Sequence, residues 1–254
     1  IAYWFSPGIS AKGSQIGSDP ATSIGNSNLL IPAPYTEAIN DRLSMPNGGA
    51  TSVDLNVTYI ERTPRYNYNA AKNNPAVGDV VTFSGHIRTW QGPISSVDYA
   101  WYLDGQAVSS GTLSNLTAGQ ESVVTLPWTW QNGPHTVSLK LDPTNTVSES
   151  SEVNNAVTDR TDGVSVGFWV EQAVYNYFQA NQKNLGIGSN SWEDWAQRQV
   201  ALWNEFNANA VYPLTPQGVT DRVRLDKVTV VPDNALPLNG GLPSNNPDSS
   251  DRTI

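Results

Sequence analysis

An alternation of apolar and polar residues between positions 53 and 159 constrains the fold of this chain more than any other feature. A period of two is the pattern of a β-strand that buries one face. In the first run the apolar residues are Val53, Leu55, Val57 and Tyr59. The same period recurs in five later segments, 81–88, 97–103, 121–130, 135–141 and 153–159. Short strands separated by turn signals predict an antiparallel β-sandwich over residues 51–162.

Several pieces of this region occur in an ordered series. They are Val53-Asp54-Leu55, Pro75-Ala76-Val77-Gly78-Asp79, Trp101-Tyr102-Leu103-Asp104-Gly105, Leu116-Thr117-Ala118-Gly119, Leu141-Asp142-Pro143 and the run 147–155. In this order they resemble the CARDB family, the cell-adhesion-related domains of bacterial and archaeal surface proteins. The resemblance covers about 40% of the chain. It implies an immunoglobulin-like sandwich without a shared catalytic activity, and the long segments at both ends lie outside the usual module.

From residue 164 the apolar period becomes helical. The apolar residues with helical spacing are Val170, Ala173, Val174, Tyr177 and Phe178. A second helix is predicted to begin after Ser191, because Glu193 and Asp194 then lie in its first turn, where the helix dipole favours acids. The short link between the two helices predicts an antiparallel helical hairpin over residues 163–210. Each helix has an aromatic stripe, which we expect to pack on an outer face of the sandwich.

The two end segments, 1–50 and 211–254, are rich in Gly, Ser, Pro and Asn, and we expect them to be mostly extended or irregular. Within the second, residues 219–231 show one or two strands with the change of parity that a bulge gives. The tail from residue 232 has a composition typical of disorder.

The chain opens with an apolar pentapeptide (residues 1–5). Its large side chains are those of Ile1, Tyr3, Trp4 and Phe5. Burial of such a side chain is worth about 1.5–3 kcal/mol, so we expect the pentapeptide to be held by protein. It can fold into its own domain, or it can bind a neighbouring copy as an added strand or an anchor. The second alternative predicts contact between subunits.

Composition excludes several classes of function. The absence of cysteine excludes disulfides, thiolate metal sites and cysteine nucleophiles. The net charge of -9 argues against a nucleic-acid partner, which requires clustered Lys and Arg. No apolar run approaches the roughly 20 residues of a membrane span. Low charge with nine Trp is typical of secreted β-proteins, and the chain starts at Ile1, so we expect a processed extracellular or cell-surface protein.

Residues 163–167 (Gly-Val-Ser-Val-Gly) match the nucleophile-elbow pattern of hydrolases. That site needs a histidine downstream of the serine. Both histidines of the chain, His86 and His135, lie upstream. We therefore interpret the motif as a crossover from sheet to helix. His86 is expected to face solvent, His135 to lie at the rim of the sandwich, and the helix carboxylates to be solvated, so the sequence predicts no catalytic residue and no enzyme.

Oxygen-bearing side chains suited to calcium gather between positions 142 and 159. The weak candidate ligands are Asp142, Asn145, Glu149 and Glu152. The segment lacks EF-hand spacing, and turn chemistry explains these residue types without a metal. The prediction is therefore that the protein has no cofactor, with calcium as the alternative.

Two triplets, 56–58 (Asn-Val-Thr) and 115–117 (Asn-Leu-Thr), match the acceptor pattern for N-linked glycans, with Asn56 and Asn115 as the modified residues. Asn56 falls on the polar face of its predicted strand. The triplet is short and arises often by chance, so glycosylation is a prediction to be tested.

These observations favour an extracellular structural or adhesive protein that joins identical subunits into a fibre or filament through its terminal segments. The alternative is an ancillary module of a secreted enzyme, either a carbohydrate-binding domain or a spacer. In that case Trp90, Trp128 and Trp130 would form a sugar-stacking platform. The platform requires the three rings to be coplanar and exposed, whereas Trp101 is expected to be buried in either case.

Overall fold

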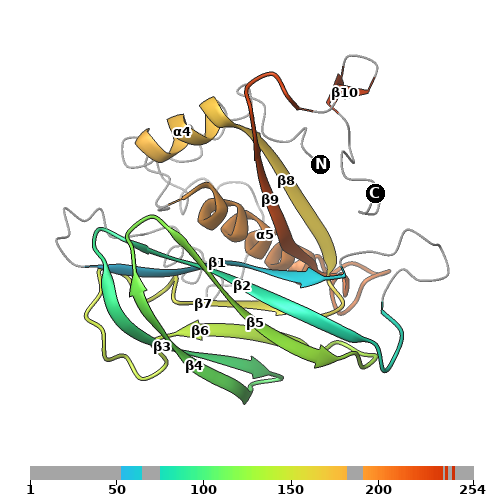
Figure 1. The fold of residues 1–254 in the computed structure, drawn as a ribbon. Coiled ribbons are helices and arrows are strands. Elements are labelled where there is room, and N and C mark those ends of the chain that lie inside the picture. The colour runs from blue at the N-terminus through green and yellow to red at the C-terminus, as the bar shows by residue number, and fades with distance from the viewer. Residues whose placement is uncertain (1–52, 65–74, 182–190, 237, 240–241, 244–254) are drawn as a thin grey trace, which may run out of the picture.

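The computed structural model describes residues 53–64, 75–181, 191–236, 238–239 and 242–243. These residues form a β-sandwich and, packed on one side of it, a second layer that contains two strands and two helices (Figure 1). We call this second layer, residues 163–231, the α/β layer.

Seven described strands form the two sheets of the sandwich. One sheet has the order β1 (Asp54–Thr63), β2 (Val80–Trp90), β5 (Glu121–Thr129). The other has the order β4 (Gln106–Leu116), β3 (Ile94–Leu103), β6 (Thr136–Leu141), β7 (Ala156–Arg160). All neighbouring strands in both sheets are antiparallel. The predicted mainly β fold with an antiparallel sandwich is confirmed.

The inward-facing residues of both sheets form one apolar cluster. It contains 17 buried residues, and Trp101, which the sequence places in the core, is fully buried at its centre. The alternation of the sequence therefore corresponds to one face turned toward this cluster. Tyr59 is the exception in β1: a register shift after Val57 turns it to the opposite face, and Ile60 enters the cluster in its place.

The strand β4 was missed by the sequence-based prediction. Most of its residues are exposed on both faces, because it is an edge strand whose sequence is rich in Ser, Gly and Thr. Such a strand shows no alternation of polarity. The signal for it was the turn before it, where Asp104 and Gly105 both adopt positive φ and connect β3 to β4.

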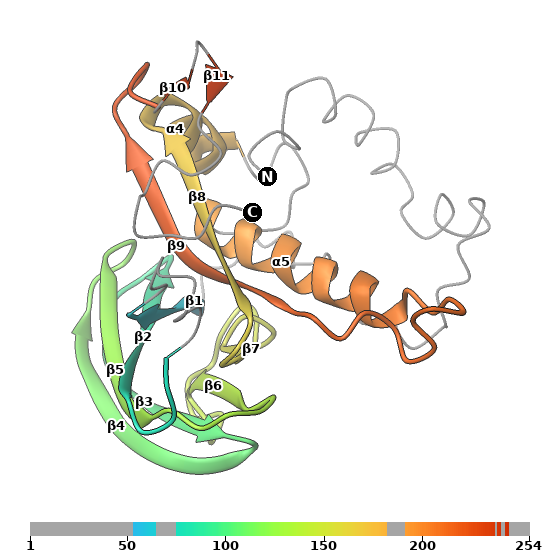
Figure 2. The same cartoon turned by 90° about the vertical axis from the view of Figure 1, so that its right-hand side faces the viewer.

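The α/β layer differs from the predicted helical hairpin. Its elements in chain order are β8 (Val164–Glu171), α4 (Gln172–Asn181), α5 (Trp192–Asn209) and β9 (Val223–Val231). The strands β8 and β9 pair in parallel, and the two helices connect them (Figure 2). The prediction of a helix from residue 164 was wrong for the first eight residues, because residues 164–171 alternate with the period of a strand and the helical spacing begins after them.

The predicted change of parity in 219–231 is confirmed as a bulge in a single strand. Val166 pairs with Leu225 and the next residue, Gly167, pairs with Lys227, so that Asp226 is the extra residue on β9. In the tail, β10 (Leu238–Asn239) and β11 (Leu242–Pro243) form a short antiparallel pair. In the described part of the chain, no helix combines the length and the apolar character that crossing a membrane requires.

Candidate interaction surface

The helix α5 buries its charged side and exposes aromatic residues. Its buried residues are Glu193, Asp194, Ala196, Arg198 and Val200. On the other side, Trp203 is 36% exposed and Phe206 is 58% exposed. A surface helix normally turns its apolar stripe to the core. The expectation that the helix carboxylates are solvated and that the aromatic stripes pack on the sandwich was therefore wrong for α5.

Specific polar contacts fix the start of α5 to the sandwich. Ser191 caps the helix by accepting a hydrogen bond from the Asp194 backbone N–H at 3.1 Å. The Asp194 carboxylate accepts bonds from Asn56 Nδ2 of β1 at 3.2 Å and from Arg198 Nη2 at 3.0 Å. Arg88 of β2 donates to Glu193 at 3.1 Å. These bonds compensate for the burial of the two carboxylates, because buried charges need partners.

A second polar junction lies between β1 and the parallel strands of the α/β layer. The Asp226 carboxylate accepts bonds from the Arg62 backbone N–H at 2.7 Å and from the Arg224 guanidinium. Arg224 also donates to Ser165 Oγ at 2.6 Å. The Arg62 guanidinium lies 5.0 Å from the centre of the Trp130 ring. The extra residue of the β9 bulge, Asp226, is thus the one that bonds to β1.

Beside this junction, Asp159 of β7 is buried. Burial raises the pKa of its carboxyl to about 7, which the charge of Arg224 opposes and that of Asp226 reinforces. Neutral Asp159 is therefore the form that the folded protein favours below that pH.

His86 is buried, not solvent-facing as predicted. Its ring stacks on Tyr59 with 4.0 Å between centroids, and its two nitrogens lie 3.3 Å from carboxylate oxygens of Glu61 and Glu121. Burial opposes protonation, but the bonds and charges of these carboxylates outweigh it and raise the pKa of His86. The polar face of the first sheet is therefore covered by the α/β layer, which the alternation alone could not show. His135 is partly exposed and contacts Asp104 at 2.7 Å, as expected for a rim residue.

An aromatic cluster lies between β8, α4 and α5. The rings of Trp192 and Trp195 stack with centroids 4.4 Å apart. Phe178 of α4 lies 5.7 Å from Trp192 and 5.8 Å from Trp195, and Phe168 of β8 lies 6.0 Å from Trp192. The cluster packs the two helices on the parallel strands by ring contacts.

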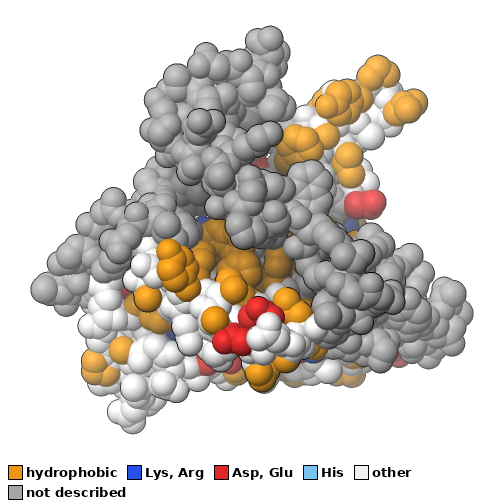
Figure 3. Space-filling view, turned by 90° about the horizontal axis from the view of Figure 1, so that it is seen from above, with side chains coloured by type: hydrophobic (Ala, Val, Ile, Leu, Met, Phe, Trp, Pro, Cys, Tyr) orange, Lys and Arg blue, Asp and Glu red, His pale blue; other side chains and the backbone are white. Residues whose placement is uncertain are grey.

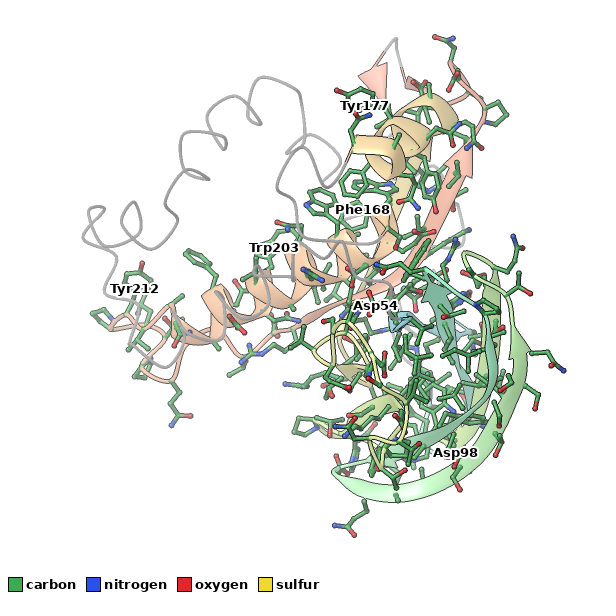
Figure 4. The ribbon with its side chains drawn as sticks, turned by 90° about the vertical axis from the view of Figure 1, so that its left-hand side faces the viewer. Asp54, Asp98, Phe168, Tyr177, Trp203 and Tyr212 are labelled. Atoms are coloured by element: carbon green, nitrogen blue, oxygen red, sulfur yellow. The ribbon has the colours of Figure 1, made fainter. Side chains whose placement is uncertain are left out.

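Exposed apolar residues extend away from this cluster over the outer side of the helices. We call them the aromatic face: Val174, Tyr177, Trp203, Phe206, Val211, Tyr212 and Leu214. Figure 4 shows Tyr177, Trp203 and Tyr212 on the side of the α/β layer that is turned away from the sandwich. In Figure 3, hydrophobic side chains gather on the side of the molecule where this layer lies. Within this set, Trp203 and Phe206 are three residues apart on α5 and therefore share one face of that helix. Exposed apolar surface of this kind marks interaction sites.

The predicted subunit contacts lie outside the described residues. This holds for Ile1, Tyr3, Trp4 and Phe5 and for the whole segment 1–50. Their role stays a prediction.

The two glycosylation triplets differ in accessibility. Asn56 is fully buried and donates to Asp194, so a glycan on Asn56 has no room in this fold. Asn115 is exposed near the end of β4, with a positive φ of 57°. Asn115 is therefore the residue at which glycosylation stays a prediction.

The three tryptophans proposed for sugar stacking do not form a platform. Trp130 is buried, and the Trp128 ring meets it edge-on, at an interplanar angle of 63°. Trp90 is partly buried, and the guanidinium of Arg88 lies 5.9 Å from its ring centre. The three rings are therefore neither coplanar nor all exposed, as a stacking platform requires.

The calcium candidates mostly bond to neighbouring backbone and amide groups. Asp142 accepts bonds from Thr146 and from the Val147 backbone N–H, so its carboxylate closes a turn. Glu149 accepts bonds from the Leu55 backbone N–H at 2.6 Å and from Asn155 at 2.7 Å.

Two further candidates complete this segment. Glu152 accepts from Asn155 at 2.9 Å, and Asn145 supplies a positive φ to the same turn as Asp142. Burial raises the pKa of Glu149 to about 7. Within the described residues, no group of three or more His, Cys, Asp or Glu side chains is placed to hold a metal ion.

The Gly-Val-Ser-Val-Gly motif lies at the start of β8 and not at a strand-to-helix turn. Ser165 is inside the strand, and its hydroxyl accepts a bond from Arg224. The crossover to the helix occurs at the other end of β8, between Glu171 and Gln172. The hydroxyl therefore stabilises the junction with Arg224.

A hollow lies beside α5, lined by β1, by β7 with the loop before it, and by α5. Among its described lining residues the one carboxylate is that of Asp194, which is paired to Arg198. A glycosidase-type site needs two facing carboxyl groups.

The sandwich matches a known family. The family model CARDB matches residues 52–159, so this part of the chain is a CARDB domain, as the order of sequence pieces indicated. CARDB is a family of non-catalytic modules whose members occur in cell-surface proteins.

Solved structures similar to this chain include other CARDB domains. A crystal structure of a CARDB domain from Pyrococcus furiosus, in complex with di-metal ions, is 25% identical and covers 44% of this chain and 94% of that chain, with a TM-score of 0.37. A solution structure of that domain is 23% identical and covers 43% and 93%, with a TM-score of 0.33. A domain assigned to a cell surface protein of Methanosarcina acetivorans is 22% identical and covers 41% and 88%, with a TM-score of 0.32. None of the curated proteins matches the chain.

Proposed function

We propose that this protein is a structural subunit of an extracellular or cell-surface assembly and that its segment 1–50 joins it to identical copies. The observation that carries the proposal is the aromatic face, which the α/β layer leaves exposed although the chain contains a sandwich on which it could have packed. Moving exposed rings such as Phe206 and Tyr212 from water into contact with apolar groups lowers the free energy. The CARDB domain is consistent with a surface or adhesion-related module.

The two polar junctions suit such a role. They connect the sandwich to the α/β layer through buried bonds of Asp194, Glu193 and Asp226 to residues of β1 and β2. A subunit that transmits force between neighbours requires its layers to stay in register. The net charge of -9 keeps free monomers apart until a specific contact forms.

Removal of residues 1–8 tests this function. We expect the shortened chain to keep the far-UV circular dichroism of the full chain but to sediment as a monomer, whereas the full chain forms filaments visible by negative-stain microscopy. A control of unchanged length replaces Tyr3, Trp4 and Phe5 with serine and should lose assembly equally, because their burial is worth about 1.5–3 kcal/mol each. A shortened chain that still polymerises would contradict the proposal.

A sugar-binding module of a secreted enzyme is supported less well. Its predicted platform is not formed, since Trp130 is buried and the Trp128 ring meets it edge-on. Binding of soluble polysaccharides that quenches tryptophan fluorescence of the full chain, without assembly, would favour this alternative.

A further inference from the structure

We propose that the aromatic face is the acceptor for the apolar pentapeptide (residues 1–5) of a second copy of this chain. The inference rests on the proposed function and adds to it the surface that receives the N-terminal segment. The surface consists of exposed residues of α4, α5 and the turn after α5, which lie apart from the sandwich core.

The chemistry of the two partners matches. The aromatic face combines aromatic rings with the aliphatic side chains of Val174, Val211 and Leu214, of which Leu214 is 95% exposed. The pentapeptide likewise contains aliphatic and aromatic side chains and no charged side chain. Aliphatic groups give little to a sugar ring, whose recognition needs hydrogen bonds around the stacking ring. An apolar peptide is therefore the occupant that this surface fits best.

The aromatic cluster gives the acceptor a rigid floor. Trp192 and Trp195 of α5 stack on each other, and Phe178 of α4 contacts both rings in a tilted arrangement. Incoming rings of Tyr3, Trp4 and Phe5 would extend this packing toward Trp203 and Phe206 on α5. Aromatic pairs of this geometry add specificity to the burial of area.

The position of the N-terminal segment allows such an exchange. It precedes β1, and β1 begins beside α5, since Asn56 bonds to Asp194 in the first turn of that helix. The 52 residues before Val53 can span about 170 Å when extended. This length reaches across to a neighbouring molecule. A contact between one surface and a different surface of the next copy is heterologous, and when it does not close into a ring it produces a filament.

The chain contains no cysteine, so engineered disulfides report the contact directly. Ser6→Cys is made in one preparation of the full chain and Gln199→Cys, on the outer side of α5 between Trp195 and Trp203, in another. On mixing and mild oxidation, we expect a disulfide-linked heterodimer on non-reducing gels. Ser109→Cys, exposed on β4, replaces Gln199→Cys as the matched control and should give at least tenfold less product.

The same cysteine variants distinguish the possible occupants of the aromatic face. A chain that carries both Ser6→Cys and Gln199→Cys should form dimers and higher oligomers; a disulfide confined to single chains overturns the inference, because the occupant is then the chain's own segment. Equal linkage to the Ser109→Cys control also overturns it. An excess of polysaccharide that prevents the linkage would identify the face as a sugar site and would equally overturn it.

A second measurement tests the acceptor surface separately from the proposed function. Replacement of Trp203 and Phe206 by serine should raise the critical concentration for assembly at least tenfold. Val108→Ser with Val123→Ser, two comparably exposed apolar residues of the sandwich, should leave it unchanged. Assembly that survives the loss of Trp203 and Phe206 but not of residues 1–8 overturns the acceptor and leaves the proposed function standing. A full chain that stays monomeric at all concentrations overturns the proposed function itself.

Discussion

The sandwich and its junction with the α/β layer are stabilised by opposite kinds of contact. Among the described residues, the sandwich buries 17 apolar residues in one cluster, whereas the second cluster, which belongs mainly to the α/β layer, contains six. Between the two parts, Arg62, Arg224 and Asp226 are almost fully buried and bond to each other or to backbone. Apolar packing is tolerant of detail, but buried ion pairs stabilise only in the right geometry. The sandwich therefore supplies stability, and the junction fixes the position of the α/β layer on it.

The largest effect should come from the sandwich core. Trp101→Ala removes a fully buried ring from the centre of the apolar cluster and should lower the free energy of unfolding by about 3–5 kcal/mol. Trp203→Ala, the same substitution on the aromatic face, should cost about 1 kcal/mol or less. Urea unfolding followed by circular dichroism measures both. Equal losses would break the distinction between a core and an exposed face.

The second largest loss of stability should come from a substitution in the junction. Arg224→Ala leaves Asp226 buried without its guanidinium partner, which we expect to cost about 3 kcal/mol. Hydrogen exchange should then increase in β8 and β9 before it increases in β2 and β3. Arg160→Ala is the control, because the Arg160–Asp162 pair is partly exposed and contributes about 0–1 kcal/mol. Uniform acceleration of exchange in all strands would show that the junction is not a separate unit.

A change of pH should have a smaller effect on stability. The folded state raises the pKa of Asp159 and Glu149, each to about 7, above the usual values of 3.8 and 4.5. It also raises the pKa of His86. Groups with a raised pKa bind more protons when folded, so their stabilisation is complete at low pH and is lost as pH rises through the folded pKa. The melting temperature should therefore be higher at pH 5 than at pH 8.

Asp159→Asn separates the junction from the other groups in this pH dependence. An amide stays neutral, so the variant should lose part of the fall in melting temperature between pH 5 and pH 8. Asp98→Asn, at an exposed site on β3, should keep the full dependence. An unchanged slope in Asp159→Asn would exclude this buried carboxyl as a source of it.

The smallest effect is expected from chelation. Asp142 and Glu149 already accept hydrogen bonds from backbone N–H groups, so these carboxyl groups have partners without a cation. Excess EDTA should change the melting temperature by less than about 2 °C. A loss of many degrees would reveal a metal among the residues of the 142–159 segment.

The sequence alone determined the sandwich and the placement of its core. A strand buried on one face must alternate in polarity, so Leu55, Val57 and Trp101 could be assigned to the core without coordinates. The bulge in β9 was visible for the same reason, as a change of parity. The edge strand β4 was not visible, since both of its faces are exposed and nothing alternates.

Which surface of an element faces outward depends on its tertiary contacts. In α5, the pattern shows an aromatic stripe and a charged side, but it does not say which of them a neighbour will cover. The side with Asp194 was covered because Asn56 and Arg198 supply partners from β1 and from the helix itself. Likewise, the polar face that carries His86 became an interior once the α/β layer packed on it. Local periodicity records that two faces differ, whereas contacts between residues more than a hundred positions apart determine which of the two is buried.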